Sequence, residues 1–290
     1  MDLGGYRIEI VPDTEFWLDG GAMFGVVPRV LWERVCPPDD QNRVRLNMNC
    51  VFIDTGREKI LIETGIGEKW SEKEIRMYGI FRDKPFAETL FEKTGCRPED
   101  ISIVVNTHLH FDHAGGNTLR ASLRDTAADV EPADRMFRPQ FPNARYFVSK
   151  DEYEAAEDPH ERDRASYLHE NWRPLSEAGQ LDLKPAEYEV VEGLKMETFV
   201  GHSKTMQTWR LTRGGTTMYG FADLIPTRHH LALPWIMGYD LFPTETLEFK
   251  RRILPQAVEE KWECLLYHDP EMPLCRLVQD ADKIRAAPID

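Results

Sequence analysis

The sequence predicts an α/β protein in which two mixed β-sheets pack face to face and helices cover their outer sides. Segments typical of strands alternate with segments typical of helices, and this alternation occurs in two similar halves of the chain. Because each sheet must bury its apolar face against another layer, two such halves favour a sandwich with outer helices. The chain has 290 residues, of which 41% are hydrophobic, so we expect residues 1–290 to form a single domain.

Strand-like segments dominate the first half. Asp54-Thr55-Gly56 is a turn sequence between two of them and predicts a hairpin. A helix is predicted to end at Gly95, and the apolar, β-branched run after it indicates a buried strand. The expected strands are 6–11, 49–53, 59–63 and 101–105, and the expected helix is 86–93.

The second half repeats the alternation. Ser149 and Glu152 have the spacing of a capping box, in which the two side chains bond each other's backbone N–H groups where a helix begins. Gly214-Gly215 predicts a second hairpin. The expected strands are 146–148, 188–191, 196–200, 208–211, 217–219 and 262–267. A helix is expected over 244–253, limited by Pro255, and an Asp/Arg-rich helix is expected to close the chain.

Composition excludes several classes of partner. The formal net charge of −14 disfavours nucleic acid, whose binding depends on Lys and Arg neutralising phosphates. No apolar run reaches the roughly 18 residues of a membrane span, and the first residues lack the basic and apolar regions of a signal peptide. The five cysteines are scattered and never form C-x-x-C, so a disulfide framework is not expected and a cytoplasmic location is predicted.

The segment 107–116 carries the strongest functional signal, because it places His108, His110, Asp112 and His113 within six positions. His108 and His110 are two apart and point to one face of an extended segment, whereas the adjacent Asp112 and His113 diverge. Two neighbouring metal ions could divide these ligands more easily than one ion could take all four. Imidazole and carboxylate ligands without thiolate suit Zn, Mn, Fe or Co, so the motif predicts a two-metal hydrolytic centre.

A two-metal centre needs further ligands, and three candidates follow later strands. His202, Asp223 and His268 each come directly after an expected strand, in the same topological position as the first motif. Rigid scaffolds present functional groups on loops at such strand ends. We therefore add these three residues to the predicted ligand set.

In the order His108-x-His110-x-Asp112-His113, His202, Asp223 and His268, the chain resembles the metallo-β-lactamase superfamily over nearly its whole length. The resemblance implies a four-layer αβ/βα sandwich with two divalent metals, zinc in the first place, at one edge of the sheets. It implies that His108, His110 and His202 bind the first metal. Asp112, His113 and His268 would bind the second, Asp223 would bridge both, and Glu63 would support the site without ligating metal.

The stretch 201–207 is similar to the Gly-His-Thr-Pro-Gly-Met-Gln stretch of the lactonase-like branch, and 21–28 and 222–227 are similar to that branch too. The branch includes N-acyl-homoserine lactonases, which act in quorum quenching, and methyl-parathion-hydrolase-like enzymes. Some acyl-homoserine lactonases have a substrate-contacting Tyr three residues after the bridging Asp. Here that position is Pro226, so the contact is either absent or supplied from elsewhere in the chain, with Tyr239 as one candidate.

The expected reaction is the opening of a small-molecule lactone. A hydroxide that bridges two metals would attack the carbonyl carbon, and Asp112 or Asp223 would carry the proton to the leaving oxygen. A phosphotriesterase is the nearest alternative, followed by a β-lactam or thioester hydrolase, because all of these use the same ligands. A nuclease and a non-catalytic binding protein are less favoured.

Apolar segments outside the motif are candidates for the substrate wall, for the core or for a homodimer interface. They comprise residues 16–17, 23–24, 26–27, 77–78, 80–81 and 233–237. His229 and His230 are not expected to ligate metal, since the predicted set is already complete.

Overall fold

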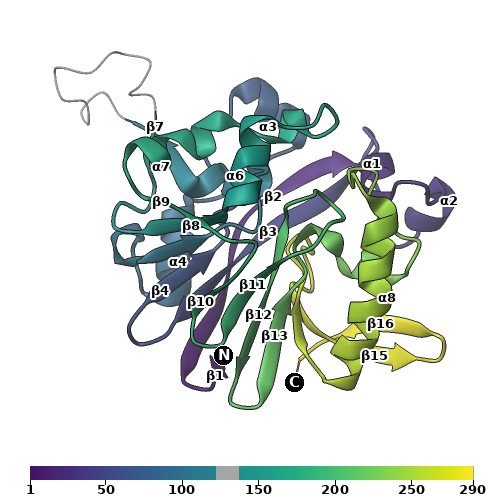
Figure 1. Cartoon of the computed structure of the whole chain (residues 1–290). Coiled ribbons are helices and arrows are strands. Elements are labelled where there is room, and N and C mark those ends of the chain that lie inside the picture. The colour runs from purple at the N-terminus through teal and green to yellow at the C-terminus, as the bar shows by residue number, and fades with distance from the viewer. Residues whose placement is uncertain (122–136, 290) are drawn as a thin grey trace.

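The structure, a computed structural model, describes residues 1–121 and 137–289. Two mixed sheets of seven strands each face one another, and the main helices lie on their outer sides (Figure 1). One continuous apolar core, contributed by residues of both sheets, fills the space between them. The four-layer αβ/βα sandwich predicted from the sequence is therefore confirmed.

The first sheet is antiparallel at one side and parallel at the other. Its first four strands pair antiparallel, whereas β4, β5, β8 and β9 run parallel. Parallel strands end at one edge of a sheet, so the loop after β5 opens at that edge. In spatial order the strands are β1 (Asp2–Leu3), β2 (Tyr6–Asp19), β3 (Arg43–Asp54), β4 (Lys59–Ile62), β5 (Ile103–Val105), β8 (Arg145–Ser149) and β9 (Leu181–Lys184).

The second sheet follows the chain order from β10 to β16, and only β13 and β14 pair in parallel. The predicted hairpin at Gly214-Gly215 joins β12 to β13, and both glycines have positive φ (58° and 79°), as a two-residue turn between twisted strands requires. The strands are β10 (Glu187–Val191), β11 (Leu194–Thr198), β12 (Gln207–Arg213), β13 (Thr216–Gly220), β14 (Glu263–Leu265), β15 (Leu274–Asp280) and β16 (Lys283–Ala287).

The helices are mostly short. The longest, α8, lies along the second sheet, while α4 packs on β2 and α6 on β8 of the first sheet (Figure 1). A separate two-stranded ladder joins β6 (Thr118–Arg120) and β7 (Phe137–Pro139). The α-helices are α1 (Gly20–Phe24), α2 (Arg29–Trp32), α3 (Glu72–Tyr78), α4 (Phe86–Thr94), α5 (Phe111–Ala114), α6 (Lys150–Glu157), α7 (Arg173–Glu177) and α8 (Pro243–Glu259).

Two predictions about the C-terminal region were wrong. The chain ends in the hairpin of β15 and β16 and not in a helix, because Cys275 and Leu277 alternate with more exposed residues and bury one face of a strand. Pro255 does not limit α8, which continues to Glu259. The helix buries Ile253 before the proline and Ala257 after it, and this packing outweighs the backbone hydrogen bond that Pro255 cannot donate.

The predicted capping box at α6 is only half present. Ser149 accepts a hydrogen bond from the Glu152 N–H (3.1 Å), so the cap itself is confirmed. The Glu152 carboxylate does not turn back to Ser149, however, but points into the protein and binds other segments.

A seam of polar contacts joins the two sheets at β3. Asn49, in the middle of this strand, donates through Nδ2 to the carbonyls of Leu266, Tyr267 and Asp269, at 3.3, 2.9 and 2.9 Å. Its backbone N–H also donates to Tyr267 O. The loop after β14 is thus held directly against the first sheet.

Candidate metal centre

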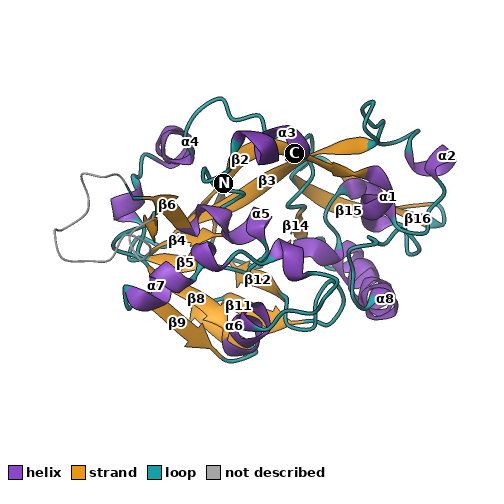
Figure 2. Ribbon diagram, turned by 90° about the horizontal axis from the view of Figure 1, so that it is seen from above, coloured by secondary structure: helices purple, strands orange, loops and turns teal. Residues whose placement is uncertain are grey.

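The seven predicted ligand residues meet at one edge of the sandwich. Four come from the loop and the short helix α5 that follow β5. Helix α5 lies near the middle of the molecule when it is viewed from above (Figure 2). The other three follow strands of the second sheet: His202 comes after β11, Asp223 after β13 and His268 after β14. All seven side chains are buried.

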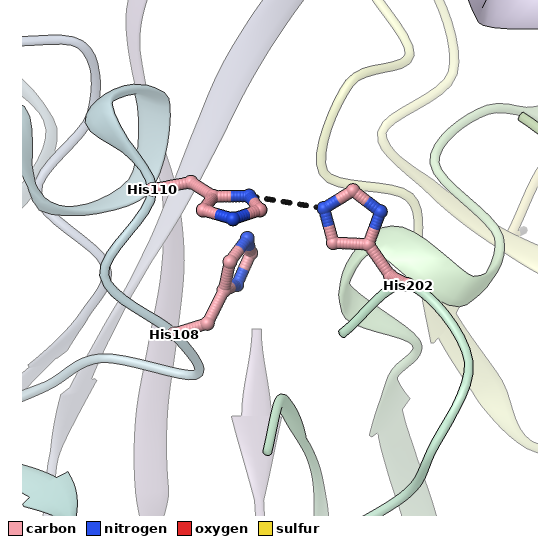
Figure 3. A group of neighbouring side chains, drawn as sticks. All are labelled: His108, His110 and His202. Carbon is pink, nitrogen blue, oxygen red and sulfur yellow. Dashed lines mark hydrogen bonds between the residues drawn. The ribbon is translucent and has the colours of Figure 1, made fainter. Parts of the chain in front are cut away.

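The first group consists of three imidazoles, those of His108, His110 and His202. One nitrogen of each lies within 4.8 Å of the others, and the rings turn toward one another in Figure 3. His202 Nε2 is 3.0 Å from His110 Nδ1. His108 Nε2 is buried and has no hydrogen-bond partner.

The second group combines two carboxylates and two imidazoles. Asp112, His113, Asp223 and His268 offer ligand atoms that also lie within 4.8 Å of one another. His113 Nε2 and His268 Nε2 are 3.2 Å apart, and they lie 3.1 and 3.0 Å from Asp223 Oδ1. The prediction that Asp112 and His113 diverge was wrong, because the helical turn of α5 lets both side chains reach one group.

Asp223 stands between the two groups. Its Oδ1 faces the second group, whereas its Oδ2 lies 3.4 Å from His202 Nε2 and 4.0 Å from His108 Nε2 in the first. One carboxylate therefore presents one oxygen to each group, which is the geometry of a bridging ligand.

These donors fit divalent metal ions. Two imidazole nitrogens only 3.0–3.2 Å apart can share at most one proton, and His108 Nε2 is left with none of its bonding capacity used. Buried polar atoms without partners are rare in folded proteins and call for an explanation such as an ion. A set of nitrogen and carboxylate ligands without thiolate suits Zn, Mn, Fe or Co.

The pKa values of the ligand imidazoles shift in both directions, and that of His202 in the first group is raised, as is that of His268 in the second. Burial lowers the pKa of His108 and His110 well below the usual value, so both imidazoles are neutral and free to coordinate. Burial would lower the pKa of His113 too, but the charge of Asp223 outweighs it and raises that pKa well above the usual value. Burial opposes ionisation of Asp223, yet His113 and His268 hold its pKa well below the ordinary range.

The ligand imidazoles are oriented by partners on their far side. His268 Nδ1 donates to Asn47 O (2.9 Å), and His202 Nδ1 donates to Asp240 Oδ1 (3.0 Å). Because carbonyl and carboxylate oxygens accept, Nδ1 carries the hydrogen and Nε2 is left facing the group. Thr107 Oγ1 lies 3.0 Å from His108 Nδ1. The carboxylates on the far side of the other two rings, Glu63 at 3.4 Å from His113 Nδ1 and Asp163 at 3.9 Å from His110 Nε2, face them without a hydrogen bond.

Unusual backbone conformations occur at two residues beside the ligands, Glu63 and Ala222. Glu63 has a φ of 64°, a left-handed conformation that is uncommon for a residue with a side chain, and its carboxylate accepts from Thr107 N–H (3.0 Å). Ala222, directly before Asp223, has a φ of 46°. Gly116 lets the loop after His113 pack closely, because a Cβ there would lie 2.1 Å from Thr64 O.

A cavity of about 180 Å³ opens above the two groups. Its base contains ligand residues of both groups, and its walls are largely apolar and aromatic. Met23, Tyr78 and Met237 come from the apolar segments identified in the sequence, whereas Phe16 and Phe24 belong to the core. The other wall residues are Leu18, Leu46, Phe111, Arg162, Asp163, Ala165, Ser166 and Tyr239.

His229 and His230 lie outside both groups. His230 is buried, stacks on Phe24 with ring centroids 4.9 Å apart and bonds Met23 O (2.8 Å), which makes it a core histidine. Asp163, Asp240 and Thr205 could not be identified from the sequence, because single polar residues in loops carry no spacing signal.

Comparison with known proteins assigns the chain to one family. Residues 44–248 match the sequence profile of the metallo-beta-lactamase superfamily, and the chain belongs to this superfamily. An N-acyl homoserine lactonase from Bacillus cereus is 29% identical over 178 residues, which are 58% of this chain and 59% of that protein. The chain thus spans about three fifths of the length of the curated relatives it matches.

Solved structures extend the likeness to the whole chain. A probable metal-dependent hydrolase from Staphylococcus aureus is 28% identical with a TM-score of 0.87, covering 100% of this chain and 99% of that one. AidC, a dizinc quorum-quenching lactonase in complex with a product, is 18% identical with a TM-score of 0.76, covering 100% and 96%. At that identity the second likeness shows the fold alone.

Proposed function

We propose that this protein is a dinuclear-metal hydrolase that opens lactones, with N-acyl-homoserine lactones as the first substrates to test. The observation that carries the proposal is the meeting of seven buried ligand side chains at the base of an apolar-walled cavity. The lactonases among the relatives support the choice of substrate.

The proposed ligands of the first metal are His108, His110 and His202. Those of the second are Asp112, His113 and His268, and Asp223 is shared by both. We propose zinc, although Mn, Fe and Co accept the same donors. Such a pair of ions polarises a carbonyl group and lowers the pKa of a coordinated water toward neutrality.

The carboxylates divide the remaining work. Both oxygens of Asp223 are engaged by imidazoles of the two groups, and its depressed pKa keeps it ionised, so its role is to hold the groups together. Asp112 lines the cavity and has a longer contact, 3.6 Å from its Oδ2 to His268 Nε2. Asp112 is therefore the better candidate to take a proton and deliver it to the leaving oxygen.

The cavity walls favour a neutral substrate with an apolar part. Leu18, Met23, Leu46 and Met237 would contact an acyl chain, and Tyr239 lies among them, where it could hydrogen-bond the substrate in place of the family tyrosine replaced by Pro226. Burial raises the pKa of Tyr239 to about 12, so its hydroxyl stays protonated and can donate.

The expected binding partner is a small molecule. None of the helices in the described residues has the length and apolarity that crossing a bilayer requires. The net charge of −14 supports a small molecule over a nucleic acid, and we keep a cytoplasmic location as part of the proposal.

A candidate homodimer surface lies around Val26, which is 91% exposed, and includes Val30, Leu31 and Val35. Light scattering of the purified protein would test whether it forms a dimer.

A hydrolysis screen by pH-stat on metal-loaded protein tests the function. It should include lactones of varied ring size and tail length, a neutral aryl phosphotriester, a cephalosporin and an acylglutathione thioester. We expect lactones to be hydrolysed fastest and His202→Ala to lower the activity at least a hundredfold, with His229→Gln as a matched histidine control that retains it. Faster turnover of the phosphotriester, or unchanged activity in His202→Ala, would contradict the proposal.

A further inference from the structure

Glu152 is a fully buried carboxylate that none of the reaction steps above uses. Its side chain is inaccessible to solvent, and none of the ion pairs among the described residues includes it. Burying a carboxylate without a cation is costly unless several hydrogen bonds compensate. The residue therefore needs an explanation beyond the helix cap that the sequence suggested.

The Glu152 carboxylate binds three segments that surround the first group of imidazoles. Oε1 accepts from the backbone N–H of Leu109 at 2.8 Å, and Leu109 stands between His108 and His110. Oε2 accepts from the hydroxyl of Thr205 at 2.5 Å, in the loop that carries His202. Both loops that supply the first group are thus hydrogen-bonded to the Glu152 carboxylate.

The third contact orients His110. The hydroxyl of Tyr167 donates to Glu152 Oε1 (3.1 Å), and the Tyr167 ring lies edge-on to the His110 ring, with centroids 4.6 Å apart. His110 and Tyr167 also pair as an isolated β-bridge. Burial raises the pKa of Glu152 to about 7, while the same three hydrogen bonds act in the opposite direction.

Other residues hold the second group. His268 is held by Asn47 O, and His113 lies beside Glu63, contacts in which Glu152 takes no part. We propose that Glu152 is a positioning residue that sets the spacing of the His108–His110 loop against the His202 loop, and so controls metal binding by the first group selectively. The inference rests on the proposed function, because it assumes that the two groups bind metal.

Metal titration tests this selectivity without relying on activity. Full-length protein is stripped with a chelator and titrated with Zn²⁺ in competition with a chromophoric chelator. His202→Ala and His268→Ala identify which binding step belongs to which group. We expect Glu152→Gln to weaken the step lost in His202→Ala by about 10- to 100-fold and to leave the other step within about threefold.

Ser149→Ala is the matched control, because it weakens the cap of the same helix and leaves the Glu152 carboxylate in place. We expect it to change neither step. If Glu152→Gln does not fold, Thr205→Val and Tyr167→Phe each remove one contact of the Glu152 carboxylate, and each should weaken the same step by a smaller factor.

Two results would overturn the inference alone: unchanged binding in Glu152→Gln and in both partner variants, or equal weakening of the two steps. Wild-type protein that binds no metal would instead overturn the proposed function, and this inference with it.

Discussion

The two groups of side chains at the centre differ in charge although they lie side by side. The first contains three imidazoles, two of which burial keeps neutral. The second contains two carboxylates, and the charge of Asp223 keeps the His113 pKa high. An ion in the first group would retain more of its positive charge, whereas one in the second would be largely neutralised. Asp223, with one oxygen toward each, is where the two environments meet.

The largest effect is expected where the groups meet. Asp223→Ala removes a ligand from both, so we expect the purified protein to lose both metals and lactone hydrolysis to fall about a thousandfold or more, since a Lewis acid contributes several kcal/mol. Metal analysis of the purified variant beside a rate measurement provides the check. Full stoichiometry in this variant would show that Asp223 is not a shared ligand.

Breaking one group at a time should separate them. We expect His202→Ala to retain about one metal per chain, in the second group, and His268→Ala to retain about one in the first, with hydrolysis reduced at least a hundredfold in each. X-ray absorption at the metal edge would distinguish a first site with three imidazole ligands from a second site with two imidazoles and one more carboxylate. Identical spectra from the two variants would mean that the groups are not independent sites.

Loosening a ligand without removing it should give a smaller effect. Asp240 accepts from His202 Nδ1, so Asp240→Asn should weaken metal binding by the first group about 10- to 100-fold and leave the second nearly unchanged. Chelator competition measures both. A change confined to the second group would contradict the assigned role of Asp240.

His230, which lies outside both groups, should affect only the pH dependence of folding stability. Burial lowers the His230 pKa to about 3, whereas the unfolded chain has the ordinary value of 6.5, so the unfolded state binds the extra proton between these limits. Stability from this residue is complete above pH 6.5 and falls by about 1.4 kcal/mol per pH unit below it. Urea unfolding at pH 7 and pH 5 should show a smaller pH dependence, by about 2 kcal/mol, in His230→Asn than in wild type. Parallel behaviour of the two proteins would refute this account.

Local sequence predicted one part of the centre better than the other. His108, His110, Asp112 and His113 are dense in sequence, and their chemistry could be recognised before any fold was known. His202, Asp223 and His268 became convincing only as residues after strands and through the family resemblance. The roles of Glu152 and Asp163 could not be predicted, because each depends on loops that meet only in the folded chain. The final hairpin was missed because its burial alternates over only a few residues.

The contacts of Asn49 with the loop after β14 limit how the protein can admit a molecule. Three carbonyls that precede and follow His268 depend on this one amide, so swinging the two halves apart would break the attachment of His268 itself. Entry must therefore take place at the rim of the cavity, where Arg162 reaches across to Gly238 O (2.6 Å) and two loops meet. Substrate range in this protein should accordingly evolve through changes in those rim loops, with the contacts of Asn49 between the sheets left unchanged.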